Sequence, residues 1–280
     1  MESDEVIVRR DGPLALLTLN RPGRTNKLTD AVMRALGAAI SEFEDDGSTR
    51  AIVLRAEGDV FCDGFDVGAR PAGPQSKRTR GDFATHAALV GDTLWRIWRT
   101  PLPVVAAVQG RCLAGAVYLT AVCDFMLTTP SAQIGMSELK LGMSPPLFNI
   151  LPWMMSYRAA KEFLYLGEVV DGAKAVQIGL ATRCVAEPAL DDEALALAHK
   201  LAAMPERVVA QMKRSVNRRW ELAGVVSGVQ HDLSRFVDDK AAMSDFQRRV
   251  RERLLGAGGE AALDELGIDL QLRGVRNPWA

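Results

Sequence analysis

The first half of the chain alternates short apolar runs with stretches of helical spacing, and this alternation restricts the possible folds more than any other feature. The apolar runs Ala51–Leu54 and Val104–Val108 suit strands, and so does the segment Asp124–Thr129. Helical spacing from Phe83 to Ile97 separates the first two runs, and the small-residue segment Leu113–Cys123, expected to be a buried helix, separates the last two. Successive strand–helix–strand units pair their strands in parallel through right-handed crossovers. The sequence therefore predicts an α/β fold.

The N-terminal segment carries the signals of two strands followed by a helix. Val6–Val8 and Leu14–Leu19 flank the turn signal Asp11-Gly12. Helical spacing follows at Met33, Leu36, Ile40 and Phe43. Thr29 precedes this pattern and is the predicted N-cap of the helix.

The second half of the chain differs in pattern. From about Ser156 onward nearly every segment has helical apolar spacing. We therefore expect two regions, a core at residues 1–195 and a helical region at residues 196–280. The segment Gly68–Gly81 is rich in Gly, Pro, Arg and Lys, and we predict a mobile loop there that could act as a lid.

Composition excludes several classes of protein. The formal net charge is −1, which gives no electrostatic signal for nucleic acid or for a membrane surface. The longest apolar stretch, Cys112–Cys123, is well short of the roughly 20 residues that a membrane span needs. The N-terminus shows no basic segment leading into an apolar one, so we expect a cytoplasmic protein. The four cysteines form no C-x-x-C pair and are expected to be buried, reduced thiols.

Histidine is too scarce to suggest metal or triad chemistry. The chain has three histidines, His86, His199 and His231, which argues against a catalytic metal site. A Ser-His-Asp arrangement would need His86, because the other two lie in the helical half. We expect His86 to be solvated or satisfied by a neighbour.

Four groups of residues follow one another at suggestive intervals. The first is Leu19–Pro22 followed by Asn26–Thr29, and the second is Phe61–Asp66. The third is Pro103–Gly110 with Leu113–Ala116 after it, and the fourth is Ala132–Gly135 with Glu138 and Gly142 after it. Together they resemble the crotonase superfamily, the enoyl-CoA hydratase/isomerase family, over roughly residues 5–255. The resemblance implies a ββα spiral core of stacked parallel strands and helices, with a C-terminal helical oligomerisation region.

The same resemblance implies a chemistry. Members of this family hold a thioester carbonyl with two backbone N–H groups while the carbon beside it becomes carbanion-like. By the family pattern these donors are the N–H groups of Phe65 and Gly115. Losing one such donor typically costs about 3–4 kcal/mol of transition-state stabilisation. Phe65 replaces the small residue that is common at its position, so its side chain is expected to shape the acyl pocket.

The acid–base residues decide between reactions. Family hydratases resemble one another in using two glutamates, and the corresponding positions here are Tyr118 and Glu138. A single carboxylate suits a 1,3 proton shift, so the favoured reading is a 3-enoyl to 2-enoyl-CoA isomerase with Glu138 as acid/base. One alternative is an enoyl-CoA hydratase in which Tyr118 or Asp63 shares the work. Another is an acyl-CoA-binding protein without turnover, which the missing first glutamate would allow. For Asp63 itself, the alternative to acid chemistry is that its carboxylate caps its loop.

Binding of the CoA moiety needs cations but no separate cofactor. Arg24 and Lys27 are the predicted phosphate contacts, and Lys77, Arg78 and Arg80 are further possibilities. Coenzyme A enters as part of the substrate. The resemblance also implies a homotrimer or a dimer of trimers.

Overall fold

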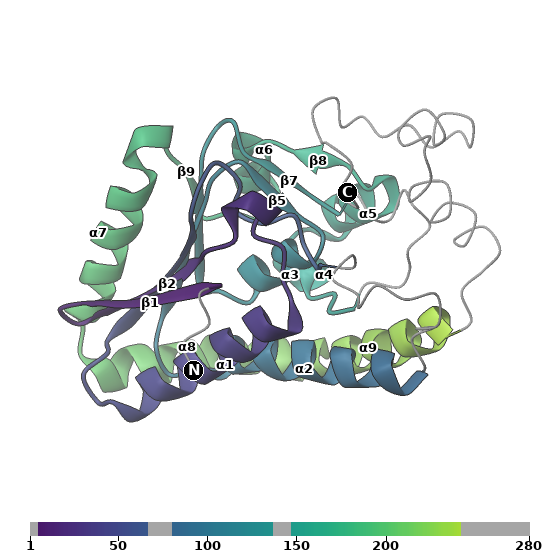
Figure 1. Cartoon of the computed structure of the whole chain (residues 1–280), viewed down its shortest axis with the longest axis horizontal. Helices are drawn as coiled ribbons and strands as arrows, with labels where there is room; N and C mark the ends of the chain where they lie inside the picture. Colours follow the sequence, from purple (N-terminus) through teal and green to yellow (C-terminus); the bar gives the residue numbers. More distant parts are fainter. Residues whose placement is uncertain (1–4, 67–79, 137–146, 242–280) are drawn as a thin grey trace.

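The computed structural model describes residues 5–66, 80–136 and 147–241 (Figure 1). One sheet has six strands in the order β1-β2-β3-β4-β6-β9, and a smaller sheet has the order β5-β7-β8. The strands of the larger sheet are β1 Val6–Asp11, β2 Leu14–Leu19, β3 Ala51–Ala56, β4 Val104–Val108, β6 Phe125–Thr128 and β9 Arg183–Cys184. Those of the smaller sheet are β5 Arg111–Leu113, β7 Gln133–Gly135 and β8 Val169–Val170.

Helices make up most of the remaining described chain. The longer ones are α1 Asp30–Asp45, α2 Arg80–Arg99, α5 Tyr157–Leu166, α7 Leu190–Ala202, α8 Glu206–Leu222 and α9 Val225–Ala241. The short ones are η1 Pro22–Arg24, α3 Gly115–Ala121, α4 Leu151–Met154, α6 Gly172–Gln177 and η3 Glu187–Ala189. No helix in the described ranges is long and apolar enough to cross a lipid bilayer.

Strand pairing follows the prediction. β1 and β2 form an antiparallel hairpin, and from β2 onward each neighbour in the larger sheet pairs in parallel. The crossovers run through α1, α2 and α3. One expected element differs, because Leu113–Cys123 is not a continuous helix. Its first residue ends strand β5, and the helix covers Gly115–Ala121.

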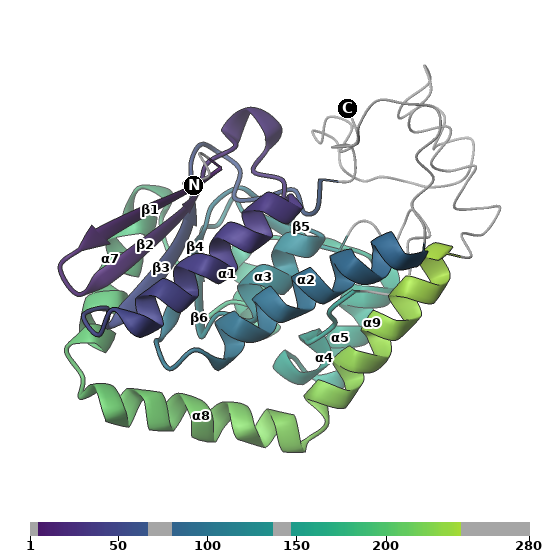
Figure 2. The same cartoon turned by 60° about the horizontal axis from the view of Figure 1, so that its bottom comes forward.

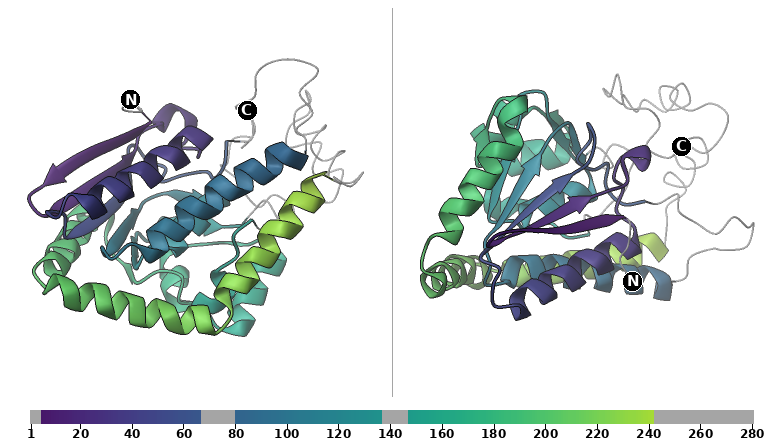
Figure 3. Two further views of the ribbon diagram at one scale, coloured as in Figure 1. Left: turned by 90° about the horizontal axis from the view of Figure 1, so that it is seen from below. Right: turned by 60° about the vertical axis from the view of Figure 1, so that its left-hand side comes forward.

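The central strands are mainly apolar because both faces of the sheet are covered (Figure 3). On one face, Leu17, Ile52 and Ala106 join a large core that includes buried residues of α1, α2 and α3. On the other face, Leu16 and Val53 pack with residues of α7 such as Leu197. Successive strand residues thus enter different cores, as the period of two requires.

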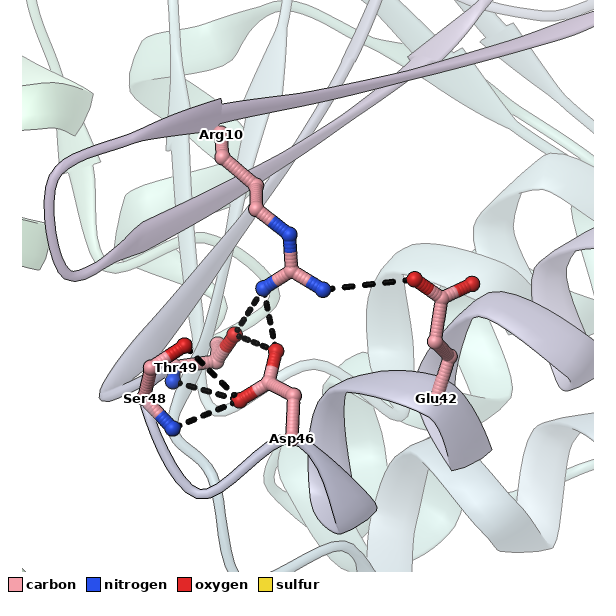
Figure 4. A network of polar contacts seen from close by, with 5 residues as sticks. All are labelled: Arg10, Glu42, Asp46, Ser48 and Thr49. Carbon is pink, nitrogen blue, oxygen red and sulfur yellow. Dashed lines mark hydrogen bonds and ion pairs between the residues drawn. The ribbon is translucent and has the colours of Figure 1, made fainter.

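Helix α1 is fixed at both ends. Its predicted N-cap, Thr29, accepts a hydrogen bond from the Val32 N–H at 3.0 Å. At its C-terminus Asp46 accepts hydrogen bonds from the backbone N–H groups of Ser48 and Thr49, and its carboxylate pairs with Arg10 of β1 (Figure 4). This network ties the end of α1 to the N-terminal hairpin and to the start of β3.

Helix α8 runs along the outer edge of the molecule, and α9 then turns back and lies beside α2 (Figure 2). Lys213 of α8 enters the core, where its ammonium group donates to Asp124 Oδ2 at 2.7 Å and to the Leu102 carbonyl at 2.9 Å. Arg80 of α2 pairs with Asp238 of α9 at 2.9 Å. The predicted division at residue 195 falls inside α7, and the two-region organisation stays a prediction.

Candidate functional site

Two chain segments that are fifty positions apart meet in a parallel β-bridge. Cys62 and Cys112 are directly paired in a parallel bridge. The Cys62 N–H donates to the Arg111 carbonyl at 2.9 Å, and the Leu113 N–H donates to the Cys62 carbonyl at 3.0 Å. These bonds place the segment that ends at Phe65 beside the segment that leads to Gly115.

The approach of the two segments requires a glycine. Gly64 has a φ of +85°, a backbone conformation that L side chains rarely adopt. A Cβ at Gly64 would lie 2.8 Å from the Ala114 Cβ and 3.1 Å from the Gly115 nitrogen. The backbone before Phe65 therefore lies directly against the backbone before Gly115.

Ala114 is held in a strained conformation. Its φ of 53° and ψ of −122° lie in a region that residues with a Cβ seldom occupy. Such strain costs about 1–3 kcal/mol and persists only where the surroundings impose it. Here the Ala114 N–H donates to the Gly135 carbonyl of β7 at 2.9 Å. The strained ψ sets the direction of the next peptide N–H, which is that of Gly115.

The N–H groups of Phe65 and Gly115 have no acceptor among the described residues. Leu28 bonds to both neighbours of Phe65: its N–H donates to the Gly64 carbonyl at 2.7 Å, and its carbonyl accepts from Asp66 at 2.8 Å. Because successive N–H groups of an extended chain point to opposite sides, the Phe65 N–H points away from Leu28. Gly115 is the first residue of α3, where the N–H has no partner within the helix.

A loop after β2 holds the first segment in place. Asn26, with a φ of 51°, accepts from the Arg21 N–H at 2.7 Å and donates to the Val60 carbonyl at 2.7 Å. Arg21 donates to the Lys27 carbonyl and pairs with Asp66 at 3.2 Å. Arg21, Asn26 and Asp66 all belong to the motifs that carry the family resemblance, and the structure shows that their side chains hold this loop.

Asp63 has a partner that the sequence did not reveal. Arg111 of β5 donates to both of its carboxylate oxygens, each at 2.8 Å, and the Asp63 side chain is 4% exposed. The hydrogen bond to Asp63 raises the pKa of Arg111. A fork-shaped pair of this kind ties β5 to the first segment, and favours a structural role for Asp63 over proton transfer.

Of the two predicted acid–base positions, the structure describes Tyr118 but not Glu138. Tyr118 lies in α3, one turn after Gly115, and is 2% exposed. Glu138, with Lys77 and Arg78, lies outside the described residues. Glu138 follows the end of β7 by three positions, and β7 is the strand bonded to Ala114.

The candidate CoA contacts have different surroundings. Arg24 is exposed in η1, and Lys27 is partly buried two positions before the α1 N-cap. Both belong to the loop that Asn26 and Arg21 anchor. Arg80 is engaged by Asp238 in α9.

The side chain of Phe65 occupies the space beside Gly115. A Cβ added to Gly115 would lie 2.4 Å and 2.5 Å from two carbons of the Phe65 ring. On another side the ring meets the His86 imidazole edge to face, with centroids 5.3 Å apart and planes at 81°. His86 Nδ1 lies 2.8 Å from Asp30 Oδ1. The expectation that His86 is satisfied by a neighbour is therefore met by a specific partner.

Thiol and metal chemistry find no support in the described chain. Cys62 and Cys112 are fully buried, and burial raises the pKa of Cys112 to about 12 and that of Cys62 well above its usual value. Both thiols therefore stay protonated and are poor nucleophiles. Within residues 5–66, 80–136 and 147–241 there is no cluster of side chains suited to a metal ion.

Sequence comparison identifies the relatives of the chain. The family described as enoyl-CoA hydratase/isomerase matches residues 9–247. A protein of Rhizobium meliloti named "Probable enoyl-CoA hydratase" is 32% identical over 228 residues, which cover 79% of this chain and 84% of the relative. A short-chain-enoyl-CoA hydratase of Clostridium acetobutylicum is 26% identical over 222 residues, covering 78% of this chain and 83% of the relative.

Solved structures of the same family resemble this chain in fold. A crystal structure of an enoyl-CoA hydratase/isomerase from Xanthobacter autotrophicus has a TM-score of 0.85 and 32% identity, covering 93% of this chain and 96% of that one. A second, of a probable enoyl-CoA hydratase from Mycobacterium thermoresistibile, has a TM-score of 0.78 and 27% identity, covering 86% and 99% of the two chains. The α/β crotonase-like fold predicted from the sequence is confirmed.

Proposed function

Because the chain belongs to the enoyl-CoA hydratase/isomerase family, we propose that it converts 3-enoyl-CoA thioesters to 2-enoyl-CoA thioesters. The reaction class rests on the family. The choice of isomerisation rests on Tyr118, a buried phenol at the position where hydratases resembling this chain have a first glutamate. No cofactor beyond the CoA of the substrate is proposed.

The observation that carries the chemistry is the pair of backbone N–H groups without acceptors. Phe65 and Gly115 present them from segments whose backbones lie in contact, and the strained Ala114 directly precedes Gly115. If the thioester oxygen of the substrate accepts a hydrogen bond from each N–H group, the two donors stabilise the negative charge that develops on this oxygen. Each donor is worth about 3–4 kcal/mol to the transition state.

Proton transfer is assigned to Glu138. Its carboxylate removes a proton from C2 of the 3-enoyl chain, and the electron pair moves onto the thioester oxygen as a dienolate. The same carboxyl group then returns the proton to C4, and the electrons move back to form the double bond between C2 and C3. A single acid/base of this kind needs no bound water.

The hydratase alternative is favoured by the names of the relatives. It requires a second group that polarises water beside Glu138. Asp63 is poorly placed for that role, because both of its oxygens accept hydrogen bonds from Arg111. Tyr118 is the remaining candidate for the second group.

One assay separates the reactions. Purified protein is given a 2-enoyl-CoA or a 3-enoyl-CoA while the absorbance of the conjugated thioester is followed. Isomerisation raises the signal from the 3-enoyl-CoA, whereas hydration lowers the signal from the 2-enoyl-CoA. Binding of either thioester without a change in absorbance would support the non-catalytic alternative and refute the proposal.

A pair of variants tests the acid/base. Glu138→Gln should lower turnover by at least about 100-fold, within the range for removal of a general acid–base group. Glu162→Gln, an exposed glutamate of α5, is the matched control and should leave turnover unchanged. Activity that survives Glu138→Gln largely intact would show that Glu138 is not the acid/base.

CoA recognition is assigned to the anchored loop after β2. We expect Arg24 and Lys27 to contact phosphate groups of CoA. Arg24→Ala and Lys27→Ala should raise KM with little change in kcat, because phosphate contacts stabilise substrate and transition state alike. An equal KM for both variants and the unchanged protein would remove these residues from the site.

The assembly is proposed to be a homotrimer or a dimer of trimers. Helix α8 exposes apolar side chains at every fourth position, namely Met204 just before it and then Val208, Met212, Val216 and Trp220. This continuous stripe suits burial against another copy of the chain.

We place the protein in the cytoplasm, since its four cysteines are free thiols.

A further inference from the structure

Three side chains link helices α1 and α2 to Gly115. They are Asp30 at the start of α1, His86 in α2 and Phe65 in the segment beside Gly115. We propose that His86, held by Asp30, is a positioning residue that keeps the Phe65 ring against Gly115 and so fixes the two N–H donors relative to each other. The proposal rests on the oxyanion role proposed above for these donors.

The first link orients the imidazole. Asp30 Oδ1 and His86 Nδ1 are 2.8 Å apart, and the His86 side chain is 13% exposed. An ionised carboxylate only accepts hydrogen bonds, so this contact places a proton on Nδ1. Asp30 is the first residue of α1, directly after the N-cap Thr29, so its backbone is fixed by the helix start. The ring of His86 is therefore held in one orientation by a rigid element.

The second link passes from His86 to Phe65. The two rings meet at 81° with centroids 5.3 Å apart, a geometry that aromatic pairs prefer. Leu28, two positions before Asp30, forms the parallel bridge with Phe65. The start of α1 thus holds Phe65 twice, through the backbone of Leu28 and through the side chains of Asp30 and His86.

The third link passes from Phe65 to Gly115. Three ring carbons of Phe65 lie within 2.9 Å of the position that a Cβ of Gly115 would take. The ring thus packs against the α-carbon of the residue that supplies the second donor. Because the ring contacts both His86 and the backbone at Gly115, a rotation of the ring would change how it packs against the residue that supplies the second donor.

Loss of the imidazole should therefore loosen the donors without removing a reacting group. A misplacement of about 1 Å costs up to about 100-fold in rate, so we expect His86→Ala to lower kcat by about 10-fold to 100-fold with KM nearly unchanged. Asp30→Asn keeps an acceptor for Nδ1–H and should restore most of the activity that Asp30→Ala loses. His199→Ala, an exposed histidine of α7, is the matched control and should have no effect.

A double-mutant cycle distinguishes positioning from direct chemistry. The cycle compares kcat for 3-enoyl-CoA isomerisation in the unchanged protein, His86→Ala, Phe65→Ala and the double variant. If His86 acts through the Phe65 ring, His86→Ala should have no further effect in the Phe65→Ala background. An equal loss of kcat in both backgrounds would overturn the proposal, since His86 would then act on the substrate or on stability independently of Phe65.

A binding probe separates failure of this inference from failure of the proposed function. A conjugated dienoyl-CoA absorbs at longer wavelength when donors polarise its carbonyl oxygen. A red shift with the unchanged protein that is smaller with His86→Ala supports both proposals. The same red shift in both proteins refutes the positioning role alone. No shift with the unchanged protein refutes the oxyanion site, and the positioning role falls with it.

Discussion

Gly115→Ala is the substitution whose consequence follows most directly from the geometry. Gly115 has no left-handed φ, so an alanine fits its backbone, and the first residue of a helix tolerates alanine well. The obstacle is the Phe65 ring, three of whose carbons would lie 2.4, 2.5 and 2.9 Å from the new methyl carbon. Ordinary contact begins near 3.4 Å.

The required displacement sets the magnitude. The difference between 3.4 Å and 2.4 Å means that ring and backbone must separate by about 1 Å. A shift of that size at a reacting centre costs up to about 100-fold, or about 2.7 kcal/mol in the activation free energy. We therefore expect Gly115→Ala to lower kcat/KM for a 3-enoyl-CoA by one to two orders of magnitude.

The assay includes its own rescue. Removing the ring in Phe65→Ala leaves room for the methyl group, so Gly115→Ala should cost much less in the Phe65→Ala background than alone. Thermal unfolding of each variant checks that the fold persists. Full activity of Gly115→Ala, or an equal loss in both backgrounds, would show that the spacing of Phe65 and Gly115 does not control catalysis.

Three further predictions concern stability. Gly110→Ala should unfold at much lower temperature than Gly12→Ala, because both have a φ of +55° but the new Cβ would lie 1.9 Å from a backbone carbonyl oxygen only at Gly110. Lys213→Met should lower the free energy of unfolding in urea by about 3 kcal/mol, because it leaves Asp124 without its cation. Burial raises the pKa of Asp124, so the Asp124 carboxyl of the folded variant keeps its proton to higher pH than that of the unfolded chain. The stability of the variant should therefore fall as pH rises. Despite partial desolvation, hydrogen bonds from Thr49, Arg10 and Ser48 lower the pKa of Asp46 well below its usual range. The contribution of Asp46 to stability should therefore be present above about pH 4 and be lost in more acidic solution. Asp46→Asn should remove this part of the acid dependence of unfolding.

The elements that the sequence predicted share a clear local pattern. β3, β4 and β6 are apolar runs between helical stretches, and Thr29 is followed by the spacing of α1. The strands that were missed, such as β8 and β9, have two residues each, which is too short for any period to show. The start of α3 was placed too early because the apolar residues of β5 continue into the helix without a polar break.

In the candidate site, too, the sequence predicted what local motifs carry and missed the contacts between residues far apart in the chain. The order of the motifs led to Phe65 and Gly115 as the predicted backbone donors, because the resemblance to the family assigns that role to these two positions. The pairing of Asp63 with Arg111 was not predicted, since the two residues are 48 positions apart and only the sheet brings them together. The contact of His86 with Asp30 spans 56 positions and depends on the packing of α1 against α2. Side-chain partners at such separations are set by tertiary structure, which local patterns do not encode.

A crystal structure with a bound acyl-CoA thioester tests the central claim most directly. The account predicts that the thioester oxygen lies within about 3.1 Å of both the Phe65 nitrogen and the Gly115 nitrogen. A thioester oxygen that contacts neither nitrogen, or only one of them, would contradict it.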